Sequence, residues 1–409
     1  MEASRQLCGH GGPSLADIPR LTDYHDVDFV LRSKDFVQAG GGHRENAPMT
    51  LHTVVSLSGE DHFRRRRVEA PVFSRSALKA CEREALEPAI TDALESCFAA
   101  VPGGEVHADL MVLAREVFAR VSARIVGIDL DAEGDEPARF LCYADRLSDG
   151  HNVDWSSRDH GEVMSRALDA KRRFVEEFFI PSWQRRHGSR RKVERPPDLL
   201  TSLIAAGDHF AQWDMDAVVR ETVLFLTAAI GSPARAVPYV VSELAGWLDQ
   251  HPEGRGRLAD PEFLRRAIGE TLRLHTPGSP KLRRARRDVI LPSGHVVRAD
   301  DHVAADIAAA NRDTAVFGPD AGAFNLRRET GSVQPFGIAF GAGPHTCIGL
   351  FMAIGKPSID GAEPTGTMVR LLLELYRAGM RPDPDNPSTR HPDAPRRYAT
   401  FPILLARPS

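Results

Sequence analysis

The amino-acid sequence predicts a mostly α-helical protein with small β-sheets. Before Pro277, apolar residues recur every three or four positions over most of the chain, as they do on one face of a helix. Beyond Pro277, short apolar runs alternate with proline, glycine and aspartate, which is typical of short strands and loops. No repeat with a period of 20–50 residues is evident, which disfavours solenoids and propellers.

Several segments carry the helical spacing. The last of them, Met215–Leu248, is interrupted by Pro233 and Pro238, because proline removes a backbone donor and crowds the preceding turn. The segments are Val27–Leu31, Phe63–Ala100, Asp109–Val126, Asp159–Trp183 and Met215–Leu248.

A further helix is predicted over residues 260–277 by the signals at its ends. Asp260 is a suitable N-cap, and Pro261 fits the first helical position. Glu262 complements the positive end of the helix dipole. The pair Pro277-Gly278 ends the helix.

The rest of the chain is predicted to be extended or irregular. Asp288–Val297 resembles two short strands around a turn, and Tyr398–Leu405 also has strand texture. Residues 311–345 form a long loop, which in a compact domain is usually functional. Residues 381–395 are expected to be solvated. The arginine-rich stretch 185–197 is expected to be a surface loop, because it lacks the interleaved aromatics of a nucleic-acid site.

Composition limits the classes of function. The 409 residues, 42% hydrophobic and 26% charged, are typical of a soluble globular protein. The net charge of −4 provides no basic field for nucleic acid or anionic membrane. The longest nearly apolar run, Thr222–Gly231, is shorter than the roughly 20 residues that cross a bilayer. Residues 1–20 lack the apolar core of a signal peptide. We therefore expect a cytoplasmic protein with no membrane and no nucleic-acid partner.

The cysteines point to one unusual position. Their odd number, wide spacing and lack of a CxxC pair argue against a disulfide framework and a structural zinc site. Most should be small buried hydrophobes. They are Cys8, Cys81, Cys97, Cys142 and Cys347.

Cys347 lies in the segment Phe340–Gly349, a glycine-rich turn that leads into an apolar helix. Helix N-terminal N–H groups can stabilise a thiolate there, and a thiolate is a soft metal ligand. Phe340 could shield the sulfur. A dinucleotide-binding GxGxxG fails because Thr346 replaces its last glycine, and no zinc ligands are spaced around His345 and Cys347. A cysteine nucleophile beside His345 stays open, although no group to orient the histidine is evident.

These residues resemble the haem-binding loop of the cytochrome P-450 family, whose Phe-x-x-Gly-x-x-x-Cys-x-Gly is matched by Phe340, Gly343, Cys347 and Gly349. Three other signals stand in the family's order: the Glu-x-x-Arg at 270–273, a meander over 311–328, and a His-x-x-x-Arg at 62–66. The resemblance implies the P-450 fold in a single domain over 1–409, with 1–20 as a loose N-terminal segment.

The resemblance also implies a set of site residues around one haem b. Cys347 would bind the iron, within a loop shaped by Gly341, Gly343 and Gly349. His62, Arg66, Arg283 and His345 would bind the propionates. Glu270 and Arg273 share a helix face, and with Arg328 they would form a buried clamp on the meander. We interpret Arg64, Arg65 and Arg67 as an exposed basic face, available to an acidic electron donor.

The oxygen-activating helix departs from the family pattern, which places an acid before an alcohol. A local alignment puts Gly231 at the acid position and Ser232 at the alcohol position, whereas a gap-free alignment puts Arg235 and Ala236 there. Both lose the acid, and we prefer the first because Ser232 keeps a hydroxyl. An Arg235 above the haem would suit a carboxylate substrate and peroxide. Two further departures are a short N-terminal segment and a helix after Cys347 that Pro357 cuts, followed by an insertion at 355–366.

The resemblance implies a monooxygenase that hydroxylates or epoxidises a small organic molecule in secondary metabolism. Electrons would come from NAD(P)H through a ferredoxin reductase and a ferredoxin. The alternatives are a peroxygenase, a catalyst of coupling or rearrangement, and a non-catalytic haem-binding or carrier-recruiting module. Substrate contacts are expected from residues 40–55, 145–180, 225–236, 278–282 and 398–401.

Overall fold

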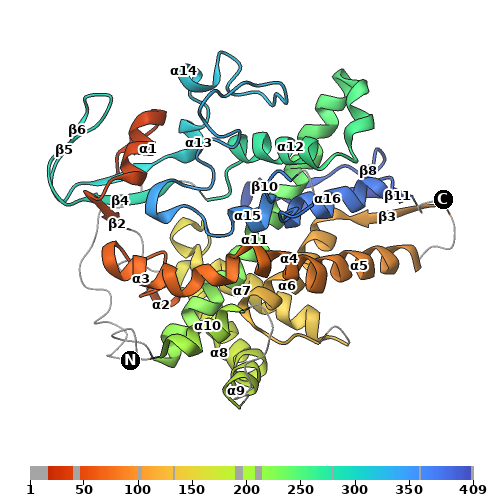
Figure 1. Ribbon diagram of the computed structural model, residues 1–409, viewed down its shortest axis with the longest axis horizontal. Helices are drawn as coiled ribbons and strands as arrows, with labels where there is room; N and C mark the ends of the chain where they lie inside the picture. Colours follow the sequence, from red (N-terminus) through yellow and green to blue (C-terminus); the bar gives the residue numbers. More distant parts are fainter. Residues whose placement is uncertain are drawn as a thin grey trace.

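The computed structural model describes residues 17–39, 47–99, 104–131, 134–188, 197–207, 214–278, 280–358 and 361–406. Helices dominate it and the sheets are small, which confirms the predicted fold class (Figure 1). The helices are α1 (Tyr24–Arg32), α2 (Ala47–Thr50), α3 (Gly59–Glu69), α4 (Arg75–Cys81), α5 (Glu87–Ala99), α6 (Leu110–Val126), α7 (Glu136–His151), α8 (His160–Phe174), α9 (Ile180–Gly188), α10 (Leu199–Ala206), α11 (Met215–Gln250), α12 (Pro261–Leu274), α13 (Ile307–Ala310), α14 (Thr314–Phe317), α15 (Leu350–Ile354) and α16 (Thr367–Arg377).

In the described part of the chain, the strands form four small sheets. One has the order β1-β7-β4-β2, with β1 parallel to β7 and the other pairs antiparallel, and another has the order β3-β11-β8. Two hairpins, β5–β6 and β9–β10, complete the set. The strands are β1 (Arg20–Leu21), β2 (Phe36–Gln38), β3 (Glu105–Asp109), β4 (Lys281–Ala285), β5 (Val289–Ile290), β6 (Val296–Val297), β7 (His302–Ala305), β8 (Arg381–Pro382), β9 (Thr389–His391), β10 (Ala394–Thr400) and β11 (Pro402–Ala406).

Helix α11 is the central element of the core. Asp214 caps its N-terminus, and its apolar side chains pack against α6, α7 and α12. Contrary to the expected interruption, it continues through Pro233 and Pro238, which are both buried. Packing on several sides can hold together a helix that proline alone would break. Among the described residues, it is also the one helix long and apolar enough to cross a bilayer. However, 56% of its most apolar stretch is buried inside the protein, so this is weak evidence for a membrane span.

The residues at helix ends predicted the structure more accurately than the apolar spacing predicted where helices run without a break. The Asp260 carboxylate accepts from a first-turn N–H of α12, as predicted, and α6 ends at Val126, the expected bound. The single helix expected over Phe63–Ala100 was wrong, because it is divided among α3, a 3-10 turn at Ala70–Phe73, α4, a π-turn and α5. Pro71 stands at the start of that 3-10 turn, where its fixed φ and missing N–H are tolerated.

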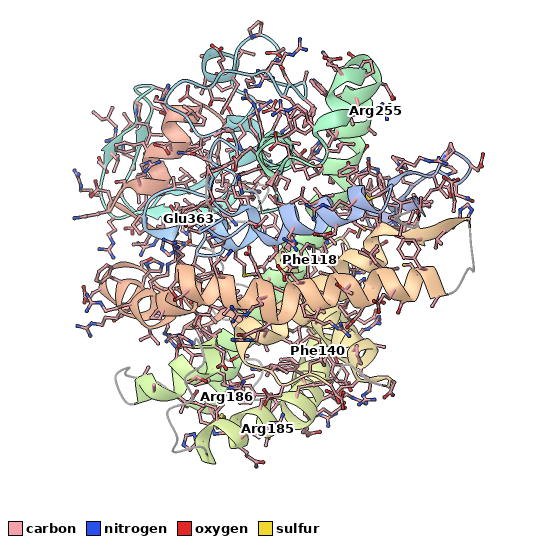
Figure 2. The ribbon with its side chains drawn as sticks, turned by 45° about the vertical axis from the view of Figure 1, so that its right-hand side comes forward. Phe118, Phe140, Arg185, Arg186, Arg255 and Glu363 are labelled. Carbon is pink, nitrogen blue, oxygen red and sulfur yellow. The ribbon has the colours of Figure 1, made fainter. Side chains whose placement is uncertain are left out.

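The expected surface loop at 185–197 is only partly correct. Arg185 and Arg186 belong to α9, where both guanidinium groups bond Asp129, and Arg186 also bonds Asp198 (Figure 2). Residues 189–196 lie outside the described part of the chain. Figure 2 contrasts these outer arginines with Phe118 and Phe140, which are 1% and 0% exposed.

The C-terminal third follows the expectations closely. Val289–Ile290 and Val296–Val297 pair as the expected hairpin, and the stretch 381–395 is extended and mostly exposed, with β8, β9 and the start of β10. The helix after Cys347 ends at Ile354, before Pro357, because Gly355 adopts a φ of 66°. A Cβ on Gly355 would lie 2.1 Å from the Thr365 carbonyl oxygen. The two ends of the insertion at 355–366 therefore lie next to each other, and α16 begins directly after it.

Candidate functional site

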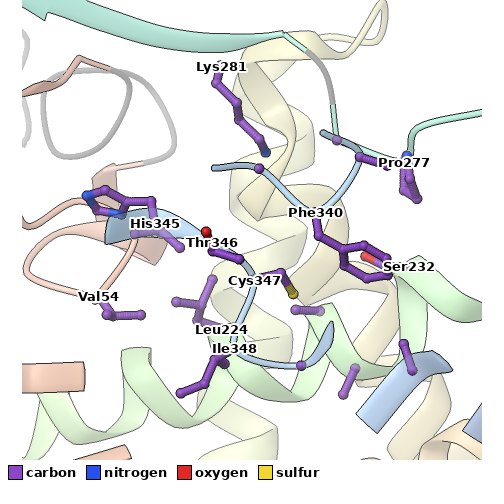
Figure 3. A pocket seen from close by; sticks show the side chains of 18 of the residues that line it. Val54, Leu224, Ser232, Pro277, Lys281, Phe340, His345, Thr346, Cys347 and Ile348 are labelled. Carbon is purple, nitrogen blue, oxygen red and sulfur yellow. The ribbon is translucent and has the colours of Figure 1, made fainter. Parts of the chain in front are cut away.

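A cavity of about 520 Å³ lies between α11 and the loop that carries Cys347 (Figure 3). This volume is within the range of small-molecule sites in proteins. Side chains from α3, α11, β4, the Cys347 loop and α15 line it, and most of them are apolar.

The Cys347 loop is held by its own backbone. The N–H of Cys347 donates to the Phe340 carbonyl at 2.8 Å, and Gly341 and Gly343 adopt φ values of 73° and 66°. Gly343 packs directly against α1, where a Cβ would lie 2.7 Å from the Arg32 Cα. The glycines therefore allow a tight turn that presents Cys347 to the cavity.

Cys347 keeps an accessible surface, and it lines the cavity. Burial raises the pKa of the thiol, whereas the Gly349 N–H and the charges of Arg66 and Lys281 lower it. The described residues contain no group of three His, Cys, Asp or Glu side chains that could hold a metal. If Cys347 binds an iron, a cofactor would therefore have to supply most of the other ligands.

Four nitrogen-bearing side chains meet at one end of the cavity. The ring centroids of His62 and His345 lie 3.8 Å apart with the ring planes tilted by 37°, and Arg66 donates to the Thr346 carbonyl. Arg283 is 4% exposed and bonds only the Gln38 side chain and the Leu282 carbonyl, so it has no carboxylate partner among the described residues. All four line the cavity.

Burial destabilises the charged forms of these groups. It lowers the pKa of His62 to about 4, of His345 to about 3 and of Arg283 to about 10. Buried cations without anions are costly, so the cluster is suited to an anionic ligand. The two propionates of a haem whose iron is bound by Cys347 fit this requirement.

Glu270, Arg273 and Arg328 form a buried ion-pair triad. Arg273 donates from Nε and Nη2 to the two carboxylate oxygens of Glu270, each at 2.8 Å, and Arg328 Nε donates at 3.1 Å. Arg273 also donates to the carbonyls of Asn311, Ala321 and Ala323. The triad therefore fixes α12 to the irregular segment that precedes the Cys347 loop.

The exposed basic face predicted around α3 needs one correction. Arg64 and Arg67 are exposed, but Arg65 is 4% exposed and pairs with Glu221 on α11. Glu69 is also fully buried, and burial together with Glu221 raises its pKa well above the usual range. Sequence could not reveal this cluster, because Arg65 and Glu221 are 156 positions apart.

Helix α11 presents only part of its predicted site. Ser232 and Ala236 line the cavity, and so does Pro233, whereas Gly231 and Arg235 are not among the lining residues. The Arg235 guanidinium runs back along its own helix, 3.4 Å from the position that a Cβ on Gly231 would occupy. Arg235, which the alternative gap-free alignment placed at the acid position, therefore lies along the helix and does not line the cavity, whereas Ala236 of the same alignment does.

Some lining residues had no individual signal in the sequence. Lys281 at the start of β4, Thr50 on α2, and Asp154 with Trp155 between α7 and α8 all face the cavity. All four fall within segments expected to contact substrate, but nothing in their spacing marked them individually. Of the segment 398–401, also expected to contact substrate, no residue lines the cavity.

The chain is similar in sequence to known proteins. The family model described as "Cytochrome P450" matches residues 256–356. The chain is 27% identical over 346 residues to the mycinamicin IV hydroxylase/epoxidase of Micromonospora griseorubida, covering 81% of this chain and 77% of that protein. It is 33% identical to the mycinamicin VIII C21 methyl hydroxylase of the same organism, but that match spans only about a third of either chain.

Solved structures show the same fold. The cytochrome P450 hydroxylase LnmA from the leinamycin biosynthetic pathway of Streptomyces atroolivaceus S-140 superposes with a TM-score of 0.71 and 23% identity, covering 95% of this chain and 91% of that one. CalO2 superposes with a TM-score of 0.73 and 22% identity, covering 95% and 90%.

Proposed function

The chain belongs to the cytochrome P450 family, and we propose that it is a haem-thiolate monooxygenase that hydroxylates or epoxidises a small organic molecule. One observation supports this most directly: Cys347, the His62–Arg283 end of the cavity and the Ser232 hydroxyl all face the same enclosed space. Cys347 would bind the iron, and the cluster that includes His62 and Arg283 would bind the propionates. The Ser232 hydroxyl would act as a proton donor beside the substrate.

When bound, the haem supplies the chemistry that takes two electrons and two protons, inserts one atom of dioxygen into the substrate and releases the other as water. The chain's residues have simpler tasks. Gly349 donates its N–H to the sulfur of Cys347 and stabilises the thiolate. Ser232 holds a proton on Oγ, and the apolar lining excludes bulk water.

We infer that electrons come from NAD(P)H through a ferredoxin reductase and a ferredoxin. The exposed Arg64 and Arg67 on α3, beside Phe63 at 56% exposure, offer charge complementarity to an acidic donor. The names of relatives that hydroxylate or oxygenate natural products support a role in secondary metabolism.

Peroxide use is a second candidate function. Gly231 precedes Ser232 where the family pattern has an acid, and Asp154 is the only carboxylate residue among the described cavity-lining residues. Few acidic groups are available to deliver protons where oxygen would be activated. This favours hydrogen peroxide as the oxidant, because its two oxygen atoms are already partly reduced. Turnover with hydrogen peroxide, compared with turnover with NADPH, ferredoxin and reductase, separates the two.

The spectrum of the reduced protein under carbon monoxide tests the haem-thiolate assignment. We expect a red-shifted Soret band that Cys347→Ser abolishes. The matched control is Cys142→Ser, because Cys142 is exposed and outside the cavity, and it should retain the band. Survival of the band in Cys347→Ser would show that another residue is the ligand.

A further inference from the structure

Gln38 on β2 lies directly opposite Arg283 on β4, and both side chains line the cavity. Residues opposite each other in an antiparallel pair share one face of the sheet, so this contact follows from the register of β2 on β4 (Figure 1). The Gln38 side-chain oxygen accepts from Nη1 of Arg283 at 2.6 Å. Because a guanidinium can only donate, the oxygen of the amide, and not its nitrogen, must face Arg283. Gln38 is therefore an acceptor that holds Arg283 from the neighbouring strand.

This contact leaves one edge of the Arg283 guanidinium open. Nη1 donates to Gln38 and to the Leu282 carbonyl, whereas Nε and Nη2 have no partner among the described residues. In the buried triad, Arg273 uses this same edge, Nε and Nη2, to bond both oxygens of one carboxylate. The open edge of Arg283 is thus the edge that binds a carboxylate through two parallel hydrogen bonds.

The two acceptors that hold Arg283 are neutral. Arg283 is 4% exposed, and Asp154, the carboxylate residue that also lines the cavity, is not among its partners. A buried arginine is usually paired with a carboxylate, as Arg65 is with Glu221. An amide and a backbone carbonyl orient the guanidinium without cancelling its charge. The whole positive charge of Arg283 therefore stays available to an anionic ligand.

Gln38 also connects β4 to the helix that carries the other nitrogen-bearing side chains of the cluster. Its backbone N–H donates to the Ser58 Oγ at 3.1 Å, and Ser58 is the N-cap residue of α3. His62 and Arg66 follow on that helix and line the same cavity. One residue thus contacts both α3 and β4, from which three of the four proposed propionate ligands come.

We propose that Gln38 is a positioning residue for the cofactor, which orients Arg283 and leaves both its open edge and its charge to a haem propionate. The inference rests on the proposed function, since it concerns the same cofactor. Gln38 carries no charge, and no motif in the sequence marked it. A neutral side chain suits this position, because a carboxylate here would pair with Arg283 and compete with the propionate.

Haem release from the holoprotein to apomyoglobin tests the proposal with two variants. Gln38→Met removes the acceptor at nearly constant length, and we expect haem release to become about tenfold faster. Gln38→Glu keeps an acceptor oxygen but gives Arg283 a carboxylate of its own. We expect this variant to release haem fastest and to have a lower haem reduction potential, because it adds a negative charge beside the cofactor. Gln184→Glu, at an exposed position on α9, adds the same charge and should match the unmodified protein in both measurements.

The order of the two variants separates positioning of Arg283 from simple support of the sheet. If Gln38 only supports the packing of β2 on β4, Gln38→Glu keeps the contact and should release haem as slowly as the unmodified protein. That result would overturn the proposal, and it stays decisive even where Gln38→Met fails to fold. In an Arg283→Met background, neither substitution should accelerate release further, because Gln38 acts through Arg283. Full additivity of the effects would also overturn the proposal.

The reduced carbon-monoxide spectrum keeps this test separate from the proposed function. A red-shifted band together with equal haem release in all variants would overturn the inference and leave the proposed function standing. Haem bound without that band would count against Cys347 as the ligand, while the order of haem release would still decide the role of Gln38. A protein that binds no haem would overturn both.

Discussion

Arg65 on α3 forms an ion pair with Glu221 on α11, and 5% and 0% of their side-chain surfaces are exposed. Both carboxylate oxygens of Glu221 also accept the Val54 N–H, at 3.1 and 3.2 Å. Val54 lines the cavity, so this buried pair links the core helix to the cavity wall. The ion pair therefore helps to position the cavity wall, whereas the neighbouring Arg64 and Arg67 are exposed and have no such contact.

Removal of Arg65 should therefore be strongly destabilising. Arg65→Met leaves two buried carboxyl groups, Glu221 and Glu69, without their cation, and we expect a loss of about 3–5 kcal/mol in the free energy of unfolding. Arg64→Met is the matched control, because Arg64 pairs with Glu60 in solvent and should cost at most about 1 kcal/mol. Urea unfolding of both variants measures the difference. Equal losses would contradict a special role for Arg65.

Sequence predicted the features that depend on near neighbours. The Asp260 cap and the turn around Cys347 are local, and a short window of residues contains each of them. Features set by distant packing were missed. Arg65 seemed exposed because its neighbours are, and α11 passes its prolines because several helices pack around it.

The Glu270 triad gives a second stability prediction. Glu270→Ala removes the shared acceptor of Arg273 and Arg328, and so leaves two buried guanidinium groups without a carboxylate between them. We expect a loss of about 3–5 kcal/mol, with haem-free or insoluble protein as the main product. Glu262→Ala on the same helix is the control, since its pair with Arg265 is half exposed. Soluble yield, haem content and the thermal midpoint measure both variants. Clean, haem-loaded Glu270→Ala protein of normal stability would contradict the prediction.

Ser232 should affect how electrons are used more than how substrate binds. In Ser232→Ala, loss of the hydroxyl should lower product formed per NADPH by about tenfold or more, with peroxide released instead. Ser232→Thr should retain most of the yield. Ala236 also lines the cavity, so Ser232→Ala combined with Ala236→Ser tests the competing alignment. Recovery of the yield in the double variant would favour Ala236 as the alcohol position, and an unchanged yield in Ser232→Ala would remove Ser232 from proton delivery.

His151 predicts an acid-sensitive step in stability. The imidazole lies at the end of α7, where its Nδ1 is 3.2 Å from the Thr227 hydroxyl of α11. Burial lowers its pKa to about 4, and the charge of Lys171 adds to the effect, although hydrogen bonds with Met49 and Leu147 oppose it. The unfolded chain, with a pKa near 6.5, binds this proton first as the pH falls. Stability is therefore complete above about pH 6.5 and is lost progressively down to about pH 4, by up to about 3 kcal/mol.

A comparison of unfolding free energies at pH 7 and pH 5 isolates this contribution. His151→Gln cannot bind the proton, so its stability should fall less between the two pH values than that of the unmodified protein. His187→Gln, at an exposed position on α9, is the control and should follow the unmodified protein. Other titrating groups contribute equally to all three proteins and cancel in the comparison. Parallel pH curves for His151→Gln and the unmodified protein would mean that the imidazole is already protonated in the folded state, or that acid opens the end of α7 without unfolding the core.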